Sequence, residues 1–254
     1  MIRAIMHGCN GKMGRMIASL TREDPEIEIV AGVDTFAAEE KPAFPVYERL
    51  ESCTTPSDVV IDFSNAAAVD GLLLGCREKK LPLVLCTTGL SQEQLQKVQE
   101  ASGEIAILKA ANMSLGINLM MDLLKKAVSV LYPAGFDVEI VERHHNQKLD
   151  APSGTALALA DAMNEEMDEI YSYNFDRSRE RKKRERTEIG ISAVRGGNIV
   201  GEHTVIFAGD DEVLEIKHTA TSRAVFGKGA IEAAKWLVSA APGLYDMSDV
   251  IAGK

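Results

Sequence analysis

The chain has 254 residues, 46% of them hydrophobic and 26% charged, a composition typical of a folded protein with one large or two smaller cores. Its formal net charge of −10 argues against non-specific nucleic-acid binding, which depends on clustered Lys and Arg. No apolar stretch approaches the roughly 20 residues of a membrane span, and no secretory signal pattern opens the chain, so we expect no membrane association and a cytoplasmic location.

Short β-rich runs alternate with helical patterns through the first half of the chain. Helices are expected to begin near Lys12, Ala66 and Ser91, and Ser91 with Gln94 has the spacing of a capping box. This alternation predicts a doubly wound parallel sheet. The expected strands cover 2–7, 27–33, 59–63, 83–86 and 105–108.

The pattern changes after about Asn112. A helix over 114–131 and a strand over 137–142 precede a loop, a further helix and three late strands over 188–194, 199–207 and 213–219. The turn signals Gly196-Gly-Asn198 and Gly209-Asp-Asp211 lie between the late strands, so we expect hairpins and a mixed or antiparallel second sheet. The Ala-rich helical segment 224–241 is expected to pack back on the first domain.

A glycine-rich loop, Gly8-Cys-Asn-Gly-Lys-Met-Gly14, follows the first strand and opens the first helix. Glycines permit a tight turn and let backbone N–H groups approach a pyrophosphate, and the helix N-terminus carries a partial positive charge of roughly half a unit. The spacing GxxGxxG differs from the commoner GxGxxG, and by itself it is also compatible with a structural turn.

Asp34 strengthens the case for a dinucleotide site. It follows the second strand, 20 residues after Gly14, where a carboxylate is expected to bind the adenosine ribose hydroxyls. Thr35 stands where an Arg could have held a 2′-phosphate, so the local chemistry favours NADH. Lys12 and Arg15 leave NADPH open.

Two later loops fall at the carboxyl edge of the expected sheet, where open α/β sheets bind ligands. Phe63-Ser-Asn65 and Cys86-Thr-Thr-Gly89 suit contacts with nicotinamide and ribose. The second loop is also explained as an ordinary start of the helix that Ser91 caps, and both interpretations can hold together.

The densest group of chemically active side chains lies where a strand ends and a helix begins. Ser153 or Thr155 can cap that helix, whose free N–H groups suit a carboxylate, and Lys148 adds a full positive charge. His144 and His145 are candidate acids, because imidazole has an unperturbed pKa of about 6.5. An isolated His pair would favour surface residues, but Lys148 and the Ser153-Gly-Thr155 segment argue against that here.

Metal binding and nucleic-acid binding are both disfavoured. Adjacent histidines do not share a helix face, no HExxH motif is present, and the four cysteines lack CxxC spacing, so we expect no metal and no disulfides.

The basic run Arg177-Ser-Arg-Glu-Arg-Lys-Lys-Arg-Glu-Arg186 contains no aromatic residue for base stacking and is interrupted by Glu180 and Glu185. We interpret it as a solvated loop. The cysteines, expected to be reduced and mostly buried, are Cys9, Cys53, Cys76 and Cys86.

Taken together, these motifs resemble the 4-hydroxy-tetrahydrodipicolinate reductase family, formerly called dihydrodipicolinate reductase. The similarity spans nearly the whole chain, and its most specific part is the segment from His144 to Thr155. Cys86, where Gly is usual, and Met113, where an aromatic residue is common, depart from the family pattern. The remaining motifs are the Gly8 loop, Cys86-Thr-Thr-Gly89, Ala110-Ala-Asn-Met-Ser-Leu-Gly-Ile-Asn118, Gly201-Glu-His-Thr-Val-Ile-Phe207, Glu215-Ile-Lys-His218 and Ser222-Arg-Ala-Val-Phe226-Gly-Lys-Gly229.

The resemblance implies a Rossmann-type doubly wound parallel sheet plus an α+β domain with a mixed sheet. The expected parts are a dinucleotide-binding domain over 1–112, a substrate-binding and oligomerisation domain over 113–222, and a C-terminal helix over 223–254 that returns to the first domain. The resemblance also implies a homotetramer in which the subunits are joined through the sheets of their second domains. The implied activity is reduction of a cyclic dicarboxylate imine by NADH or NADPH in diaminopimelate and lysine biosynthesis.

The resemblance also implies roles for individual residues. Hydride would pass to ring C4 after loss of water, and the resulting enamine would take a proton from Lys148, His144 or water. His144 and Lys148 are therefore the expected catalytic residues, and the expected substrate-binding residues are His145, Ser153, Gly154 and Thr155. The expected cofactor-binding residues are Gly8, Cys9, Asn10, Gly11, Lys12, Met13, Asp34, Cys86, Thr87, Thr88, Ala110, Ala111, Asn112 and Met113.

Two competing functions stay open at this stage. A semialdehyde dehydrogenase on the same two-domain plan would need an activated cysteine, for which Cys86 is the only plausible nucleophile. A dinucleotide-sensing or scaffold protein would bind NADH without turnover and would have no particular need for Lys148.

Overall fold

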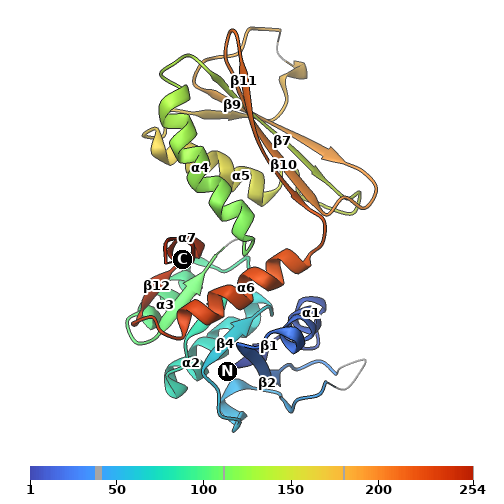
Figure 1. Cartoon of the computed structure of the whole chain (residues 1–254), viewed down its shortest axis with the longest axis vertical. Helices are drawn as coiled ribbons and strands as arrows, with labels where there is room; N and C mark the ends of the chain where they lie inside the picture. The colour runs from blue at the N-terminus through green and yellow to red at the C-terminus, as the bar shows by residue number, and fades with distance from the viewer. Residues whose placement is uncertain (38–41, 111, 180, 254) are drawn as a thin grey trace. The chain divides into compact units, whose positions relative to one another are not determined.

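The computed structural model describes residues 1–37, 42–110, 112–179 and 181–253. These residues form two compact units, one made of Met1–Leu115 with Ala224–Lys254 and the other of Gly116–Arg223 (Figure 1). Within the described residues, no helix has the length and apolar character needed to cross a membrane.

The first unit is built on a parallel sheet of seven strands in the order β12-β6-β5-β4-β1-β2-β3. β1 lies between β4 and β2, so the strand order reverses there, and open α/β sheets bind ligands at such a point. The strands are β1 (Ile2–His7), β2 (Ile27–Val33), β3 (Val46–Tyr47), β4 (Val59–Asp62), β5 (Leu83–Leu85), β6 (Ala106–Lys109) and β12 (Gly243–Tyr245).

Helices cover both faces of this sheet. Because successive strand residues point to opposite faces, Met6 and Ile61 contribute to one core and Ile5 and Val60 to the other. The first core includes side chains of α1 (Lys12–Leu20), α6 (Ala224–Leu237) and α7 (Met247–Ala252), and the second includes side chains of α2 (Val69–Lys79) and α3 (Gln92–Ser102). The predicted doubly wound sheet is confirmed.

The second unit pairs one mixed sheet with two helices. The strand order is β11-β10-β7-β9-β8, and β7 runs parallel to β9 but antiparallel to β10. Side chains of both helices pack with the strands in one apolar core. The elements are α4 (Leu115–Leu131), β7 (Asp137–His144), α5 (Gly154–Glu166), β8 (Ser172–Asn174), β9 (Glu188–Arg195), β10 (Gly201–Ala208) and β11 (Val213–Ala220).

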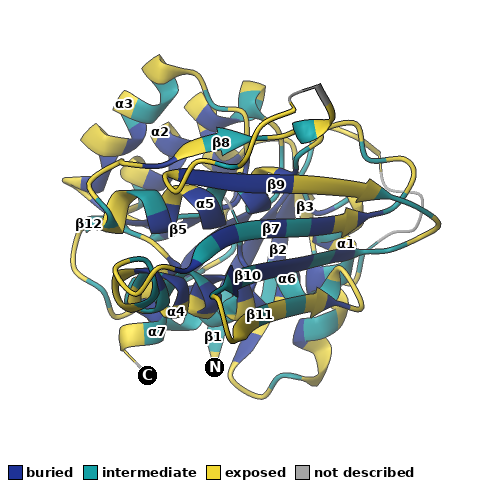
Figure 2. Ribbon diagram, turned by 90° about the horizontal axis from the view of Figure 1, so that it is seen from above, coloured by how far each residue is buried: buried dark blue, intermediate teal, exposed yellow. Residues whose placement is uncertain are grey.

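One of the two predicted hairpins is wrong. Gly209-Asp-Asp211 does join the antiparallel neighbours β10 and β11. The turn at Gly196-Gly-Asn198 instead connects β9 to β10 across β7, which pairs with both. Figure 2 shows β7 between them, and β9 passing from buried to exposed along its length. The turn residues predicted that the chain reverses direction, but they did not predict that β7 lies between the two strands they connect.

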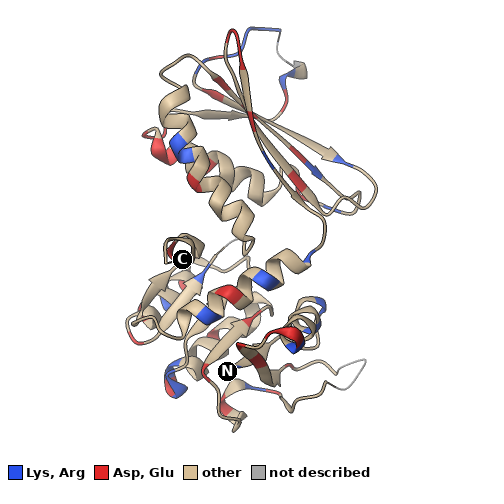
Figure 3. Cartoon of the chain, viewed as in Figure 1, with Lys and Arg blue, Asp and Glu red and all other residues tan. Residues whose placement is uncertain are grey.

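The basic run is less fully solvated than predicted. Most of its described residues are exposed, but Arg177 forms ion pairs with Glu139 and Glu188, and Arg184 pairs with Asp137. Figure 3 colours the Lys and Arg residues of the chain blue and the Asp and Glu residues red. These acids belong to β7 and β9. The positive charge of the two arginines is therefore used to hold the segment against its own sheet.

Candidate active site

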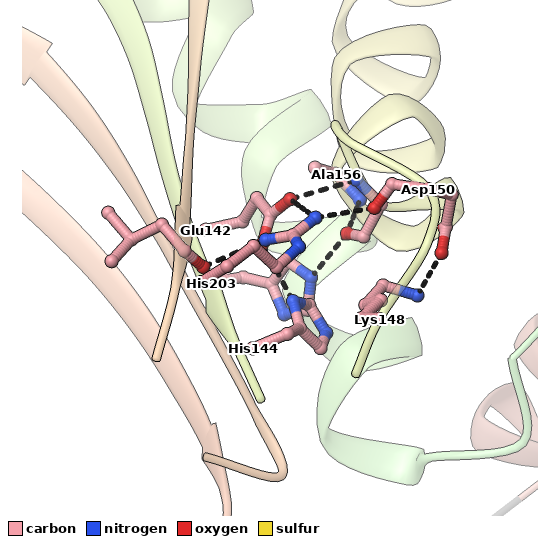
Figure 4. Close-up of polar contacts among 9 residues, drawn as sticks. Glu142, His144, Lys148, Asp150, Ala156 and His203 are labelled. Carbon is pink, nitrogen blue, oxygen red and sulfur yellow. Dashed lines mark hydrogen bonds and ion pairs between the residues drawn. The ribbon is translucent and has the colours of Figure 1, made fainter. Parts of the chain in front are cut away.

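Two polar residues continue the buried side of β7. Val138 and Ile140 point into the core of the second unit, and the same alternation places Glu142 and His144 on that side. The Glu142 side chain is fully buried, and its Oε2 lies 2.6 Å from Nδ1 of His144 (Figure 4). Gly201 lies beside the other ring nitrogen, and a Cβ there would be 3.1 Å from Nε2.

The Glu142 carboxylate is the hub of this arrangement. Arg195, at the end of β9, binds it with two parallel contacts of 2.7 Å, and the backbone N–H of Ser153 donates to Oε1 at 3.0 Å. Burial alone would raise the pKa of Glu142, but the Arg195 guanidinium, the His144 ring and the Ser153 N–H together hold it below its ordinary value. Glu142 is therefore a buried anion with its oxygens fully engaged.

Ser153 is the residue that caps α5. Its Oγ accepts from the backbone N–H of Ala156 at 3.2 Å and lies 3.1 Å from Nε2 of His203 on β10. Burial, followed by the nearby His144 ring, lowers the pKa of His203 to about 4, so this ring is neutral at physiological pH. The two imidazoles meet edge to face, with 5.2 Å between centroids.

The Lys148 ammonium lies in the loop between β7 and α5. Its Nζ is 2.8 Å from Oδ1 of Asp150, and the side chain is 22% exposed. The hydrogen bond from Lys148 is the main reason that the pKa of Asp150 is lowered. In Figure 4 the ammonium is directed at this carboxylate. Lys148 is therefore held in the loop that leads to the capped helix start, with its ammonium paired to Asp150.

The remaining predicted substrate residues border these groups. His145 directly follows β7, and its carbonyl oxygen accepts from the Lys148 N–H at 3.2 Å. Gly154 and Thr155 begin α5 behind the Ser153 cap. The structure thus brings all six predicted catalytic and substrate-binding residues into one strand-loop-helix segment.

The glycine-rich loop of the first unit has the close contacts expected of a dinucleotide cradle. Gly8 has a φ of +81°, and a Cβ there would lie 2.6 Å from the carbonyl oxygen of Phe63. A Cβ on Gly14 would collide with the Gly8 carbonyl oxygen. Gly11 is the N-cap of α1 and offers no side-chain cap, which leaves the first helical N–H groups to a ligand.

A cavity of about 580 Å³ opens beside this loop, lined in part by Gly8, Asn10, Gly11 and Asp34. The Asp34 carboxylate accepts the backbone N–H groups of Asn10 and Phe36, each at 2.9 Å. These contacts fix its position, and each oxygen keeps a lone pair for a further donor. The glycine cradle, the uncapped helix start and the oriented carboxylate fit a dinucleotide.

The other predicted cofactor residues are divided between this loop and neighbouring strand ends. Cys9 is buried against Gly32, and Lys12 and Met13 begin α1. The hydroxyl of Thr87 donates to Asp62 at 2.6 Å. Cys86, Thr87 and Thr88 follow β5, and Ala110, Asn112 and Met113 follow β6, whereas Ala111 lies outside the described residues.

The sequence did not predict the roles of three residues that contact the segment 144–155. These residues are Glu142, Arg195 and His203. Glu142 could have been found, because a buried strand pattern that continues into an acid and a histidine indicates a buried polar pair. Arg195 and His203 come from other strands, 53 and 50 residues from their partners Glu142 and Ser153. No local pattern predicts those contacts.

Each of the two units matches a model of a known protein family. Residues 2–113 match the model described as dihydrodipicolinate reductase, N-terminus, and residues 116–251 match the model of its C-terminus. The chain belongs to the dihydrodipicolinate reductase family. The 4-hydroxy-tetrahydrodipicolinate reductase of Caldanaerobacter subterraneus subsp. tengcongensis is 54% identical over 253 residues, covering 99% of this chain and 98% of that protein. That of Clostridium tetani is 50% identical over 247 residues, covering 97% and 96%.

A solved structure of the dihydrodipicolinate reductase family has the same architecture. The dipicolinate-bound dihydrodipicolinate reductase from Paenisporosarcina sp. TG-14 aligns with a TM-score of 0.82 and 26% identity, covering 97% of each chain. The predicted family membership and fold class are therefore confirmed.

Cys86 lacks the lowered pKa of an activated thiolate, and the described residues contain no cluster of metal-binding side chains. The four cysteines are buried thiols without disulfide partners. Burial, followed by the charge of Asp62, raises the pKa of Cys86 well above its ordinary value. No group of three or more His, Cys, Asp or Glu side chains among the described residues is arranged to hold a metal ion.

Proposed function

We propose that this protein catalyses the NAD(P)H-dependent reduction of 4-hydroxy-tetrahydrodipicolinate to tetrahydrodipicolinate, a step of diaminopimelate and lysine biosynthesis. The observation that carries the proposal is the Glu142–His144 pair beside the capped start of α5 and Lys148. These contacts place an ammonium and the start of a helix in the same segment as an oriented imidazole. Family membership over nearly the whole chain supports the same reaction.

The proposed substrate is a small cyclic dicarboxylate. The N–H groups at the start of α5 and the Lys148 ammonium are suitable donors for carboxylate oxygens. His145, Ser153, Gly154 and Thr155 are the proposed substrate-binding residues. Lys148 is bound to Asp150 at 2.8 Å, so the substrate carboxylate would compete with that partner for the ammonium.

His144 and Lys148 are the proposed catalytic residues. Because Nδ1 of His144 keeps a proton for the Glu142 carboxylate, Nε2 is the nitrogen left to exchange a proton with substrate. Glu142 thereby fixes the ring orientation and tautomer. When bound, the reduced nicotinamide supplies the hydride, and the proton comes from His144, Lys148 or a water that they hold.

NADH is the proposed preferred cofactor. The support is Asp34, whose carboxylate is oriented at the end of β2 by two backbone N–H groups and faces the cavity. A fixed carboxylate accepts from free ribose hydroxyls and repels a 2′-phosphate. The proposed NADH-binding residues are the fourteen cofactor-binding residues that the sequence analysis names, including Ala111.

The competing functions receive less support. A semialdehyde dehydrogenase needs a nucleophilic thiolate, whereas the buried Cys86 thiol has a raised pKa. Full activity of Cys86→Ser in the reductase assay would exclude that mechanism. A sensing protein would bind NADH without consuming it, so a turnover assay distinguishes it directly.

We also propose a cytoplasmic homotetramer joined through the sheets of the second units. The support is family resemblance together with exposed apolar residues on the second sheet. Val194, Val213 and Leu214 are exposed by 45%, 60% and 43%. Light scattering of the purified protein would give the mass, and a monomer would contradict the assembly.

The experiment that tests the function follows NADH oxidation by absorbance with freshly generated substrate. We expect turnover with NADH, with NADPH compared in parallel, and inhibition by dipicolinate-like diacids. Absence of NADH oxidation, together with no binding of diacids, would overturn the proposal.

A further inference from the structure

His7 and Asp62 end two neighbouring parallel strands of the first unit. They are direct partners in the register of β1 with β4, the pair at which the strand order of the sheet reverses. Ligands of open α/β sheets bind in the crevice at the carboxyl ends of such strands. The two side chains therefore stand where a bound dinucleotide would cross the sheet edge.

Asp62 is a fully buried carboxylate whose oxygens are both engaged. Its Oδ1 lies 2.6 Å from Nδ1 of His7 and accepts the Ser64 N–H at 3.2 Å, and its Oδ2 accepts the Thr87 hydroxyl at 2.6 Å. A buried carboxylate requires donors, so the His7 ring must present a proton from Nδ1. This contact fixes both the ring plane and the tautomer.

Nε2 is the ring nitrogen of His7 that does not face Asp62. The side chain is only 10% exposed, yet His7 lines the cavity of about 580 Å³ together with Gly8, Asn10 and Asp34. Among the hydrogen bonds of the residues that the structure describes, none involves Nε2 of His7. A ligand that fills the cavity would displace water from this nitrogen, so it must provide a hydrogen-bonding partner or lose affinity.

We propose that Nε2 of His7 hydrogen-bonds a ribose hydroxyl of the bound dinucleotide, with Asp62 and Thr87 as the residues that position the ring. A hydroxyl suits either protonation state of Nε2, because it both donates and accepts. The inference rests on the proposed function, since it needs a dinucleotide in this cavity. It adds a binding residue outside the glycine-rich motif.

His7→Asn tests the proposal, because an asparagine amide N–H can replace the Nδ1 donor to Asp62 but places nothing at Nε2. We expect the Kd of NADH, measured by fluorescence titration, to rise about 3- to 10-fold, as for loss of one hydrogen bond. The thermal midpoint without cofactor is expected to stay at the wild-type value. His218→Asn is the matched control, since it makes the same change on β11 of the second unit and is expected to leave the Kd unchanged.

An unchanged NADH affinity in folded His7→Asn would overturn the proposal. If that variant fails to fold, histidine-selective ¹⁵N NMR of the wild-type protein decides: NADH must shift the His7 Nε2 resonance, and an unmoved resonance overturns the contact. Failure of the proposed function is recognised separately, because it would leave the wild-type protein without NADH binding or turnover. A wild-type enzyme that turns over while His7→Asn binds normally refutes only the His7 contact.

Discussion

The Glu142 carboxylate and the His144 imidazole lie two residues apart on β7, with 2.6 Å between Oε2 and Nδ1. Arg195 neutralises the carboxylate from the neighbouring strand through two contacts of 2.7 Å. The ring is thus held by a charged partner that is itself immobilised. This arrangement orients the ring and leaves Nε2 as the nitrogen that we propose exchanges a proton with the substrate.

Replacement Glu142→Gln should impair the chemical step more than substrate binding. The amide can present an N–H toward Nδ1, which favours the wrong tautomer, and it leaves the Arg195 charge without its anion. We expect kcat to fall by at least about tenfold, within the range for general acid–base catalysis, while the NADH Kd is unchanged. Glu139→Gln on the opposite side of β7 is the control, and equal losses in both variants would contradict the role of Glu142.

His203 should make the folded protein sensitive to mild acid. Its pKa is lowered to about 4 by burial, whereas an unfolded histidine titrates near 6.5, so the unfolded chain binds the extra proton between these values. Above about pH 6.5 the titration of His203 does not affect stability. As the pH falls from about 6.5 toward 4, the free energy of unfolding decreases, and the loss is about 2 kcal/mol at pH 5. Urea unfolding of His203→Gln at pH 7.5 and 5.0 should show a smaller acid loss than wild type. Identical losses would show that the ring does not stay neutral in the fold.

Lys148→Ala should lower turnover severely and leave NADH binding nearly unchanged. The lysine belongs to the loop before α5, whereas the glycine cradle belongs to the first unit. Steady-state kinetics and NADH titration measure the two effects independently. Lys217→Ala removes another ion-paired lysine of the second unit and should have little effect on either. A matching loss of cofactor affinity in Lys148→Ala would refute this assignment.

Asp34→Ala should weaken the binding of NADH more than the binding of NADPH. Loss of the carboxylate removes an acceptor for the ribose hydroxyls and relieves repulsion of a 2′-phosphate. Because Asp34 also accepts two backbone N–H groups, Asp34→Asn is measured alongside it to keep part of that loop structure. Asp70→Ala, on α2, is the control for loss of a surface acid. An unchanged ratio of the two affinities would mean that Asp34 does not contact the ribose.

Much of the fold follows from local patterns. Alternating apolar strands and helical periods located β1, β2, β4, β5 and β6 and predicted their parallel arrangement. The Ser91 capping box forms as expected, with contacts of 3.2 and 3.1 Å to Gln94. Short edge strands such as β3 and β12 have only two or three residues, too few to show a periodic pattern.

The candidate site was predictable where its residues are close in sequence. The segment from His144 to Thr155 contains its own helix cap and a lysine, so its residue types marked it as a candidate site, and the family resemblance supplied the expected roles. The partners that orient it come from β9 and β10, and this pairing depends on β7 entering between them. Turn residues cannot reveal such an insertion, because Gly196 and Gly197 allow the chain to reverse whether or not a strand fills the gap.

The position of Gly201 limits what can replace it. Even a methyl group there would press on Nε2 of His144 from 3.1 Å. A residue larger than glycine on this neighbouring strand would therefore crowd the ring at Nε2, the nitrogen that we propose exchanges a proton with the substrate. Under this proposal, access to Nε2 depends on a position that itself carries no functional group.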